Sequence, residues 1–169
     1  MPASAAPNPY RAARALLPAA LGLAIAAIAG AWVFELAFGY APCKLCLLQR
    51  WPYYIGIPLG LAAYAAGGAA TSAGRVLIAL FVVAFLVSAG LGFYHAGAEW
   101  KFWAGPTDCG GRIQEGPASV LDLRKSLETA RVVRCDEAAL RVLGLSFPGW
   151  NVLVSIAAAG LAAAGFRRR

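Results

Sequence analysis

The chain has 169 residues, enough for one domain, and 60% of them are hydrophobic whereas only 14% are charged. Soluble domains hold about 45–50% apolar and about 25% charged residues, so this composition points to a protein embedded in lipid. The formal net charge is +7. It does not predict nucleic-acid binding, because the basic residues flank apolar runs and form no patch with interleaved aromatics. An anionic membrane surface explains them better.

Four apolar runs predict an all-α integral membrane protein with a single domain over residues 1–169. A membrane-crossing helix needs about 20 predominantly apolar residues. The runs meet this length and lack the polar face, at 3.6-residue spacing, that helices of a soluble bundle show. The first run is too long for the apolar core of a signal peptide, about 7–15 residues, so we expect it to be a span. The predicted spans are about 16–38, 53–70, 76–95 and 147–166.

The count of spans predicts which connections share a side of the membrane. Loops 39–52 and 96–146 fall on one side with all four cysteines, whereas both termini and the short turn 71–75 fall on the other. Lys and Arg are more numerous on the cysteine side, which opposes a cytoplasmic N-terminus. Most of them lie in the long loop, however, where that rule weakens. Cysteines gathered on one face indicate an oxidising compartment, so we expect cytoplasmic termini and extracytoplasmic cysteines.

The long loop is expected to contain one short amphipathic helix. Gly116 and Pro117 suit a helix start, and Val120, Leu123 and Leu127 then recur at helical spacing among charged residues. The helix lies either on the membrane surface or against the loop's own small core.

The sharpest motif is Pro42-Cys43-Lys44-Leu45-Cys46 at the mouth of the second predicted span. A Cys-x-x-Cys pair closes a small disulfide, and a helix N-terminus stabilises a thiolate there. Arg50 follows Cys43 by seven positions and Cys46 by four, so the three side chains share one helix face. A cation on that face stabilises a Cys46 thiolate and an anion on a bound acceptor. Alternatively, Arg50 is an interfacial anchor that reaches lipid phosphate.

The other candidate residues are less specific. Cys109 and Cys135 lie apart in the long loop, where they form either a reactive pair or a loop-stapling disulfide. A zinc site made of all four cysteines usually needs two close-spaced pairs, and only one is present, so no metal is expected. His95, at the end of the third span, either anchors the interface or hydrogen-bonds a bound acceptor. Glu35 is a candidate because it is ionisable within a predicted span.

Together these features resemble the bacterial disulfide bond formation protein B family, DsbB, whose quinone-coupled relay serves the oxidase DsbA. The resemblance covers most of residues 16–166. It rests on the four-span plan, the Pro-Cys-x-x-Cys with its Arg, Tyr94-His95, the loop cysteines, and Phe147-Pro148-Gly149-Trp150. Gln49 departs from the pattern, since many family members carry an acidic residue before the Arg.

The resemblance implies a thiol oxidase of the bacterial inner membrane that sustains disulfide bond formation. A reduced DsbA-like thioredoxin-fold protein of the periplasm would attack a Cys109–Cys135 disulfide at Cys109. Cys135 would then attack the Cys43–Cys46 disulfide at Cys43. The freed Cys46 would pass electrons to a membrane quinone, ubiquinone or menaquinone, held beside Arg50 and His95.

Three other functions are compatible with parts of the sequence. A membrane scaffold would hold its cysteines as inert disulfides. A reductase that carries electrons outward would need cysteines deep in the membrane or on its inner side. A relative of the vitamin K epoxide reductases would carry its Cys-x-x-Cys on the last helix of the bundle. In this chain the motif opens the second span.

Overall fold

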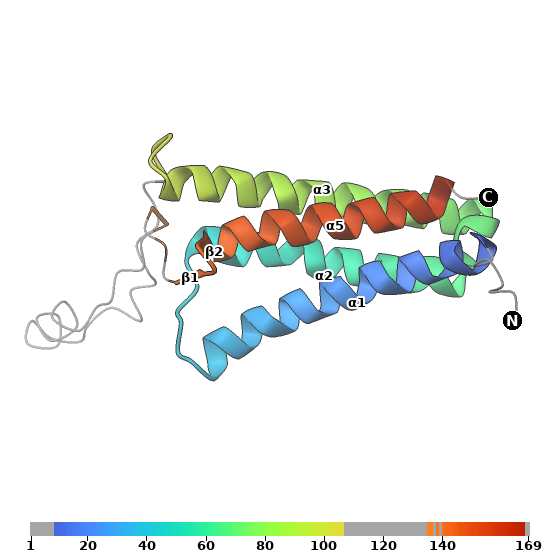
Figure 1. Cartoon of the computed structure of the whole chain (residues 1–169), viewed down its shortest axis with the longest axis horizontal. Helices are drawn as coiled ribbons and strands as arrows, with labels where there is room; N and C mark the ends of the chain where they lie inside the picture. The colour runs from blue at the N-terminus through green and yellow to red at the C-terminus, as the bar shows by residue number, and fades with distance from the viewer. Residues whose placement is uncertain (1–8, 107–134, 137, 139, 168–169) are drawn as a thin grey trace, which may run out of the picture.

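The computed structural model describes residues 9–106, 135, 136, 138 and 140–167. Within this part the chain is helical apart from one small hairpin (Figure 1). The predicted amphipathic helix of the long loop and Cys109 lie outside the described residues. The elements are α1 (Pro9–Leu36), α2 (Lys44–Ala65), the 3₁₀ turn η1 (Gly68–Ala70), α3 (Ser72–Glu99), β1 (Arg141–Val142), β2 (Leu145–Ser146) and α5 (Phe147–Arg167).

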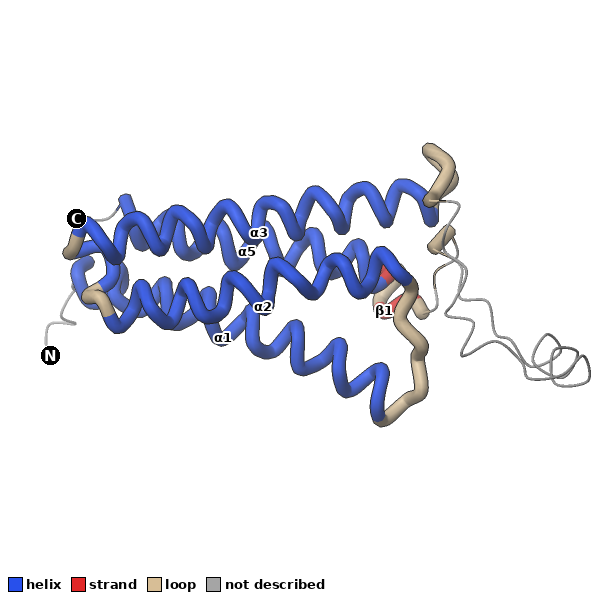
Figure 2. Tube along the Cα trace, turned by 180° about the vertical axis from the view of Figure 1, so that it is seen from behind, coloured by secondary structure: helices blue, strands red, loops and turns tan. Residues whose placement is uncertain are grey.

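The four long helices run up and down along one axis. Both chain ends and the connection between α2 and α3 lie at one end of the bundle (Figure 1). The connection between α1 and α2 lies at the other end, together with the hairpin. Seen from behind, α1 diverges from the other helices towards that second end (Figure 2). The two ends of the molecule therefore carry different loops, as the alternating spans predicted.

A tight turn joins α2 to α3 because glycines allow it. Gly67 and Gly68 have positive φ angles of 89° and 61°, a region that favours glycine. The Thr71 side chain caps α3 by accepting a hydrogen bond from the Gly74 N–H at 3.0 Å. A Cβ atom on Gly74 would lie 2.0 Å from the Gly68 carbonyl oxygen. A side chain at this position is therefore incompatible with the turn.

Aromatic side chains of α3 fill the centre of the bundle, where glycines of α2 make room for them. Phe81 and Phe85 are fully buried. A Cβ on Gly56 would come within 2.7 Å of the Phe85 ring, and one on Gly60 within 3.0 Å of Phe81. The outer surface is apolar instead: Val33, Leu36, Ile55, Leu61, Val76, Val83, Leu86 and Ile156 are among its exposed side chains. Such a surface is suited to lipid.

Three of the described helices are long and apolar enough to cross a membrane: α1 from Ala15, α3, and α5 up to Phe166. The fourth long helix, α2, begins at Lys44 and ends at Ala65. The expected span at 53–70 lies partly in the turn beyond it. Any 18-residue window within α2 must include Gln49 and Arg50, which lowers its mean hydropathy. Polar residues at one end of α2 thus set it apart from the other three helices.

The hairpin before α5 was not anticipated. Arg141 pairs with Ser146 and Val142 with Leu145 in an antiparallel register. Leu143 and Gly144 both have positive φ angles, 53° and 84°, as a two-residue hairpin turn requires. The Trp150 indole N–H donates to the Val142 carbonyl oxygen at 2.9 Å. This bond ties the hairpin to the first turn of α5, beside the start of α2 (Figure 1).

Candidate redox site

Cys43 is the N-cap of α2, so the Cys-x-x-Cys motif occupies the helix start that the sequence predicted. The Cys43 sulfur accepts a hydrogen bond from the Cys46 N–H at 3.2 Å. The two sulfurs are 2.8 Å apart and both cysteines are free thiols. A disulfide needs a sulfur separation of about 2.05 Å. The two sulfurs therefore need to approach by less than about 1 Å to form a disulfide.

The dithiol is electrostatically asymmetric. The pKa of Cys43 is lowered from 9.0 to about 5, chiefly by the side-chain hydrogen bond that it shares with Cys46. Burial opposes this shift because it favours the neutral thiol, whereas His95 and the Cys46 N–H add to the lowering. The same pairing raises the pKa of Cys46, which keeps its proton. The sequence had indicated a Cys46 thiolate, whereas this geometry puts the negative charge of the reduced pair on Cys43.

We predict that the reduced protein carries a thiolate that is lost only when the pH falls through about 5. The folded pKa is depressed, so the Cys43 anion persists at neutral pH, where an ordinary cysteine is mostly protonated. Ultraviolet thiolate absorbance of the reduced protein, followed from about pH 4 to pH 10, measures it. The Cys43→Ser variant serves as the reference. A difference curve that rises only near pH 9 would contradict this assignment.

His95 is buried, with 2% of its surface exposed, and its ring nitrogens have separate partners. Nε2 lies 3.7 Å from the Cys43 sulfur, and Nδ1 lies 2.7 Å from the Gln49 amide nitrogen. Gln49 uses its oxygen to accept from Asn151 at 2.8 Å, so its NH₂ group faces His95. His95 Nδ1 is thus an acceptor, and a neutral ring directs its Nε2–H at the Cys43 sulfur.

The polar chain continues from Gln49 into the bundle. The Tyr53 hydroxyl donates to the Asn151 side-chain oxygen at 2.6 Å, and the Asn151 amide lies 3.2 Å from the Ser88 carbonyl oxygen. Ser155 donates to the Ser88 hydroxyl at 3.0 Å. Three helices are therefore joined behind the thiols by hydrogen bonds, which hold Gln49 and hence His95 in place.

Arg50 is buried inside the protein, with 8% of its surface exposed. Its guanidinium forms an ion pair with Glu35 of α1 and lies 5.0 Å from the centre of the Trp32 ring. It also lies 3.5 Å from the Ala31 carbonyl oxygen. These contacts bind α2 to α1 where α1 diverges. An interfacial anchor would instead extend its guanidinium outward to lipid phosphate, whereas Arg50 directs its guanidinium to groups of α1.

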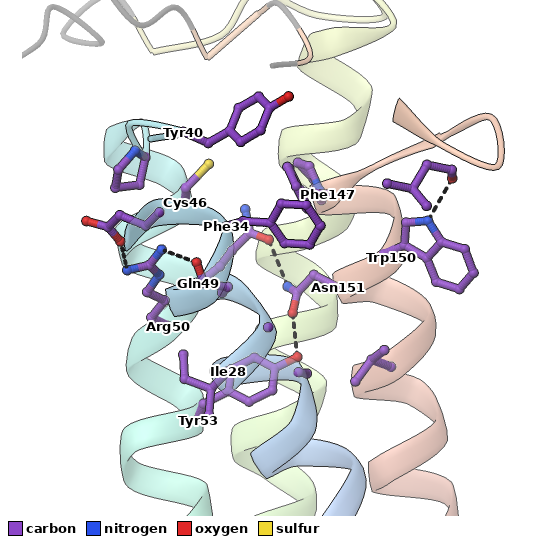
Figure 3. A pocket seen from close by; sticks show the side chains of 18 of the residues that line it. Ile28, Phe34, Tyr40, Cys46, Gln49, Arg50, Tyr53, Phe147, Trp150 and Asn151 are labelled. Atoms are coloured by element: carbon purple, nitrogen blue, oxygen red, sulfur yellow. Dashed lines mark hydrogen bonds and ion pairs between the residues drawn. The ribbon is translucent and has the colours of Figure 1, made fainter. Parts of the chain in front are cut away.

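A cavity of about 350 Å³ opens between α1, α2 and α5 next to the dithiol. Figure 3 shows Cys46, Gln49 and Arg50 on one side of it and Phe147, Trp150 and Asn151 on another. Most of the wall is apolar, and the polar groups are few. Small-molecule sites have this size and character. His95 is not among the lining residues; it contacts Cys43 instead. Arg50 and Cys46, in contrast, both line the cavity.

Cys135 lies against the dithiol although it is distant in the sequence. It is 2% exposed, is disulfide-bonded, and packs in one cluster with Cys43, Leu45 and Cys46. A cysteine of the long loop and the Cys-x-x-Cys motif are therefore in contact. Lys101 holds the neighbouring Asp136 through a 2.7 Å ion pair.

The sequence analysis missed two residues of the site, although a feature of the sequence could have identified both. Glu99 and Asn151 are polar residues at or within apolar runs, where such residues are commonly functional. The Glu99 side chain is 3% exposed, and its Oε1 lies 3.9 Å from His95 Nε2. Gln49, noted only as a departure from a pattern, is the residue that orients His95.

The fold and the site together define a helical membrane protein built for thiol–disulfide chemistry. The sequence profile described as "Disulfide bond formation protein DsbB" matches residues 13–165. The chain belongs to the DsbB family.

Curated relatives agree with this assignment. "Disulfide bond formation protein B" of Pseudomonas syringae pv. tomato is 34% identical over 76% of this chain and 74% of its own length. "Disulfide bond formation protein B 1" of Pseudomonas fluorescens is 28% identical over 79% and 78%. An uncharacterized protein of Rickettsia prowazekii is 26% identical over 79% and 76%. No solved structure matches the chain.

Proposed function

We propose that this protein oxidises the dithiol of a DsbA-like periplasmic partner and passes the electrons to a membrane quinone. The observation that carries the proposal is that Cys46 opens onto a largely apolar cavity while Cys135 packs in one buried cluster with Cys43 and Leu45. One side of the motif thus meets a cysteine of the loop, and the other meets a space suited to a small apolar acceptor. Membership of the DsbB family supports the same chemistry.

The relay moves two electrons and two protons. The partner's dithiol becomes a disulfide as the Cys109–Cys135 bond is reduced, with Cys109 attacked first. Cys135 then attacks Cys43 of the Cys43–Cys46 disulfide, which forms a Cys135–Cys43 bond and releases the Cys46 thiol. Cys109 next attacks Cys135, so that the loop disulfide re-forms and the Cys43 thiol is released. Oxidation of Cys43 and Cys46 closes the cycle.

A quinone bound in the cavity would supply the two-electron acceptor. Arg50 would offer it a buried cation, and Cys46 would face it as the reacting sulfur. His95 would act from the other side of the pair by stabilising charge on Cys43. A strong acceptor is needed because a DsbA-type partner has a potential near −120 mV, whereas structural disulfides lie below about −300 mV. Reduction of an ordinary disulfide by that partner would be uphill by roughly 8 kcal/mol.

The experiment that tests this function is cysteine labelling of the purified, fully reduced protein. Addition of a ubiquinone or menaquinone analogue should convert Cys43 and Cys46 from labelled to protected, with one quinol formed per disulfide. A partner dithiol should restore labelling. A scaffold with inert disulfides would show no change in labelling with either reagent.

We further propose four spans in the inner membrane, with cytoplasmic termini and the cysteines in the periplasm. The helices place the termini at the end opposite Cys43 (Figure 1). We predict that alkaline phosphatase is inactive when fused after Phe166 and active when inserted within residues 110–115. Membrane insertion should be checked for each fusion. The reverse pattern of activity would disprove both the orientation and the periplasmic oxidase.

A further inference from the structure

Four metal-ligating side chains converge at the start of α2 and the end of α3. The ligand atoms of Cys43, Cys46 and His95 all lie within 4.8 Å of one another. Glu99 adds a carboxylate, with Oε1 3.9 Å from His95 Nε2. Its other oxygen is buried and has no hydrogen-bond partner among the residues that the structure describes. Ser146 hydrogen-bonds the carboxylate and Arg141 lies near enough to attract it, but these contacts leave one buried oxygen without a partner in the described part of the chain.

The distances between the ligand atoms can be compared with those of a tetrahedral zinc site. Bond lengths of about 2.3 Å to sulfur and about 2.0–2.1 Å to nitrogen or oxygen imply three ligand separations. They are about 3.8 Å between sulfurs, about 3.5 Å from sulfur to nitrogen and about 3.3 Å from nitrogen to oxygen. The Cys43–His95 distance is 3.7 Å and the His95–Glu99 distance is 3.9 Å. Metal binding therefore needs two adjustments: the sulfur pair, at 2.8 Å, must open by about 1 Å. The Glu99 carboxylate must move inward, because it lies outside the group of ligand atoms within 4.8 Å of one another.

The charges favour a divalent cation of the zinc class. Loss of the Cys46 proton would place a second thiolate beside the Cys43 thiolate and the Glu99 carboxylate, and a bound cation would relieve the repulsion among them. Sulfur and imidazole ligands select zinc-like ions over magnesium or calcium. Gln49 lies 2.7 Å from His95 Nδ1 and can orient the ring from behind once its amide oxygen faces that nitrogen. A disulfide offers no thiolate, so the site exists only in the reduced protein.

We propose that the reduced protein binds one thiophilic divalent cation through Cys43, Cys46, His95 and Glu99, and releases it on oxidation. Binding displaces the thiol protons and moves no electrons. While the cation is bound, neither sulfur is available to close the disulfide. The consequence for turnover, inhibition by zinc-class ions, rests on the proposed function; the binding itself does not.

Cobalt(II) is the probe, because a tetrahedral site with two thiolates gives it strong visible bands and a sulfur-to-metal charge-transfer band. The full-length protein is reduced with a phosphine and titrated with cobalt, then with zinc. The expected result is one tetrahedral cobalt per reduced chain, displaced by zinc, and none in the oxidised protein. Equal cobalt binding by the oxidised and reduced protein, or an octahedral cobalt spectrum, would overturn the proposal. This test needs only the unsubstituted protein.

Two variants assign the ligands. Glu99→Gln should weaken cobalt binding by about tenfold or more. Glu35→Gln changes a partly buried acid that is not one of the proposed ligands, and it should leave cobalt binding unchanged. The Cys109→Ser/Cys135→Ser variant should keep the spectrum; its loss would place the loop thiols in the site instead. Quinone-dependent oxidation is measured in parallel with a chelator present. Oxidation without cobalt binding rejects the metal site alone, and cobalt binding without oxidation rejects the proposed function alone.

Discussion

Replacement of Cys46 by serine is expected to abolish quinone reduction, by more than about a thousandfold, because the reacting sulfur is removed. Cys46 is the motif cysteine that lines the cavity. A Cys46→Ser protein cannot close the Cys43–Cys46 bond, so the electrons have no exit. The rate is measured as quinol formation with a reduced partner in excess. Leu47→Ser, a change on an exposed side chain of the same helix turn, is the control and should retain most of the activity.

The same variant should still capture the partner. The first exchange is proposed to occur in the long loop at Cys109, which Cys46 does not take part in. A single-cysteine partner should therefore form a mixed disulfide with Cys46→Ser, identified by mass spectrometry as a bond to Cys109. Capture on Cys43 alone, and never on Cys109, would reverse the proposed order of the relay.

Replacement of Arg50 by glutamine is expected to raise the Michaelis constant for quinone by about tenfold to a hundredfold. The loss of a partly buried charge contact costs on the order of 1–3 kcal/mol. Arg50 lines the cavity beside Cys46 and is held by Glu35 and Trp32. Arg50→Lys should recover only part of the loss, because an ammonium cannot reproduce the planar guanidinium. Lys44→Gln removes a charge from a residue that does not line the cavity and should change the constant little.

The ion pair with Glu35 provides a sharper test of the role of Arg50. Removal of Arg50 also leaves the partly buried Glu35 without this partner, and an unpaired charge in such a place can destabilise the protein by itself. If Arg50 serves only to neutralise Glu35, the double variant Glu35→Gln/Arg50→Gln should recover normal quinone kinetics. If Arg50 acts on the bound quinone, the raised constant should persist in the double variant. Kinetics are compared per folded molecule, so that a loss of yield is not read as a loss of function.

Hydropathy and motif spacing were sufficient to predict the helical membrane class, the position of Cys43 at a helix start, and the family. These are local properties: an apolar run of spanning length behaves as a helix in lipid whatever its neighbours are. Likewise, side chains at i, i+3 and i+7 share a helix face by geometry alone. The exact end of α2 was not predictable from hydropathy, because the turn at Gly67 and Gly68 is itself apolar.

Only the tertiary structure determined which side chains of the site form hydrogen bonds and ion pairs with one another. Gln49, His95 and Asn151 belong to three different helices, and nothing in their spacing predicts that they form one hydrogen-bonded chain. The partner of Arg50 was likewise undetermined, since Glu35 lies on another helix. The placement of the reduced pair's charge on Cys43 depends on which thiol donates and on the nearness of His95. Such contacts join residues far apart in sequence, and their distances are set by helix packing, which no local pattern encodes.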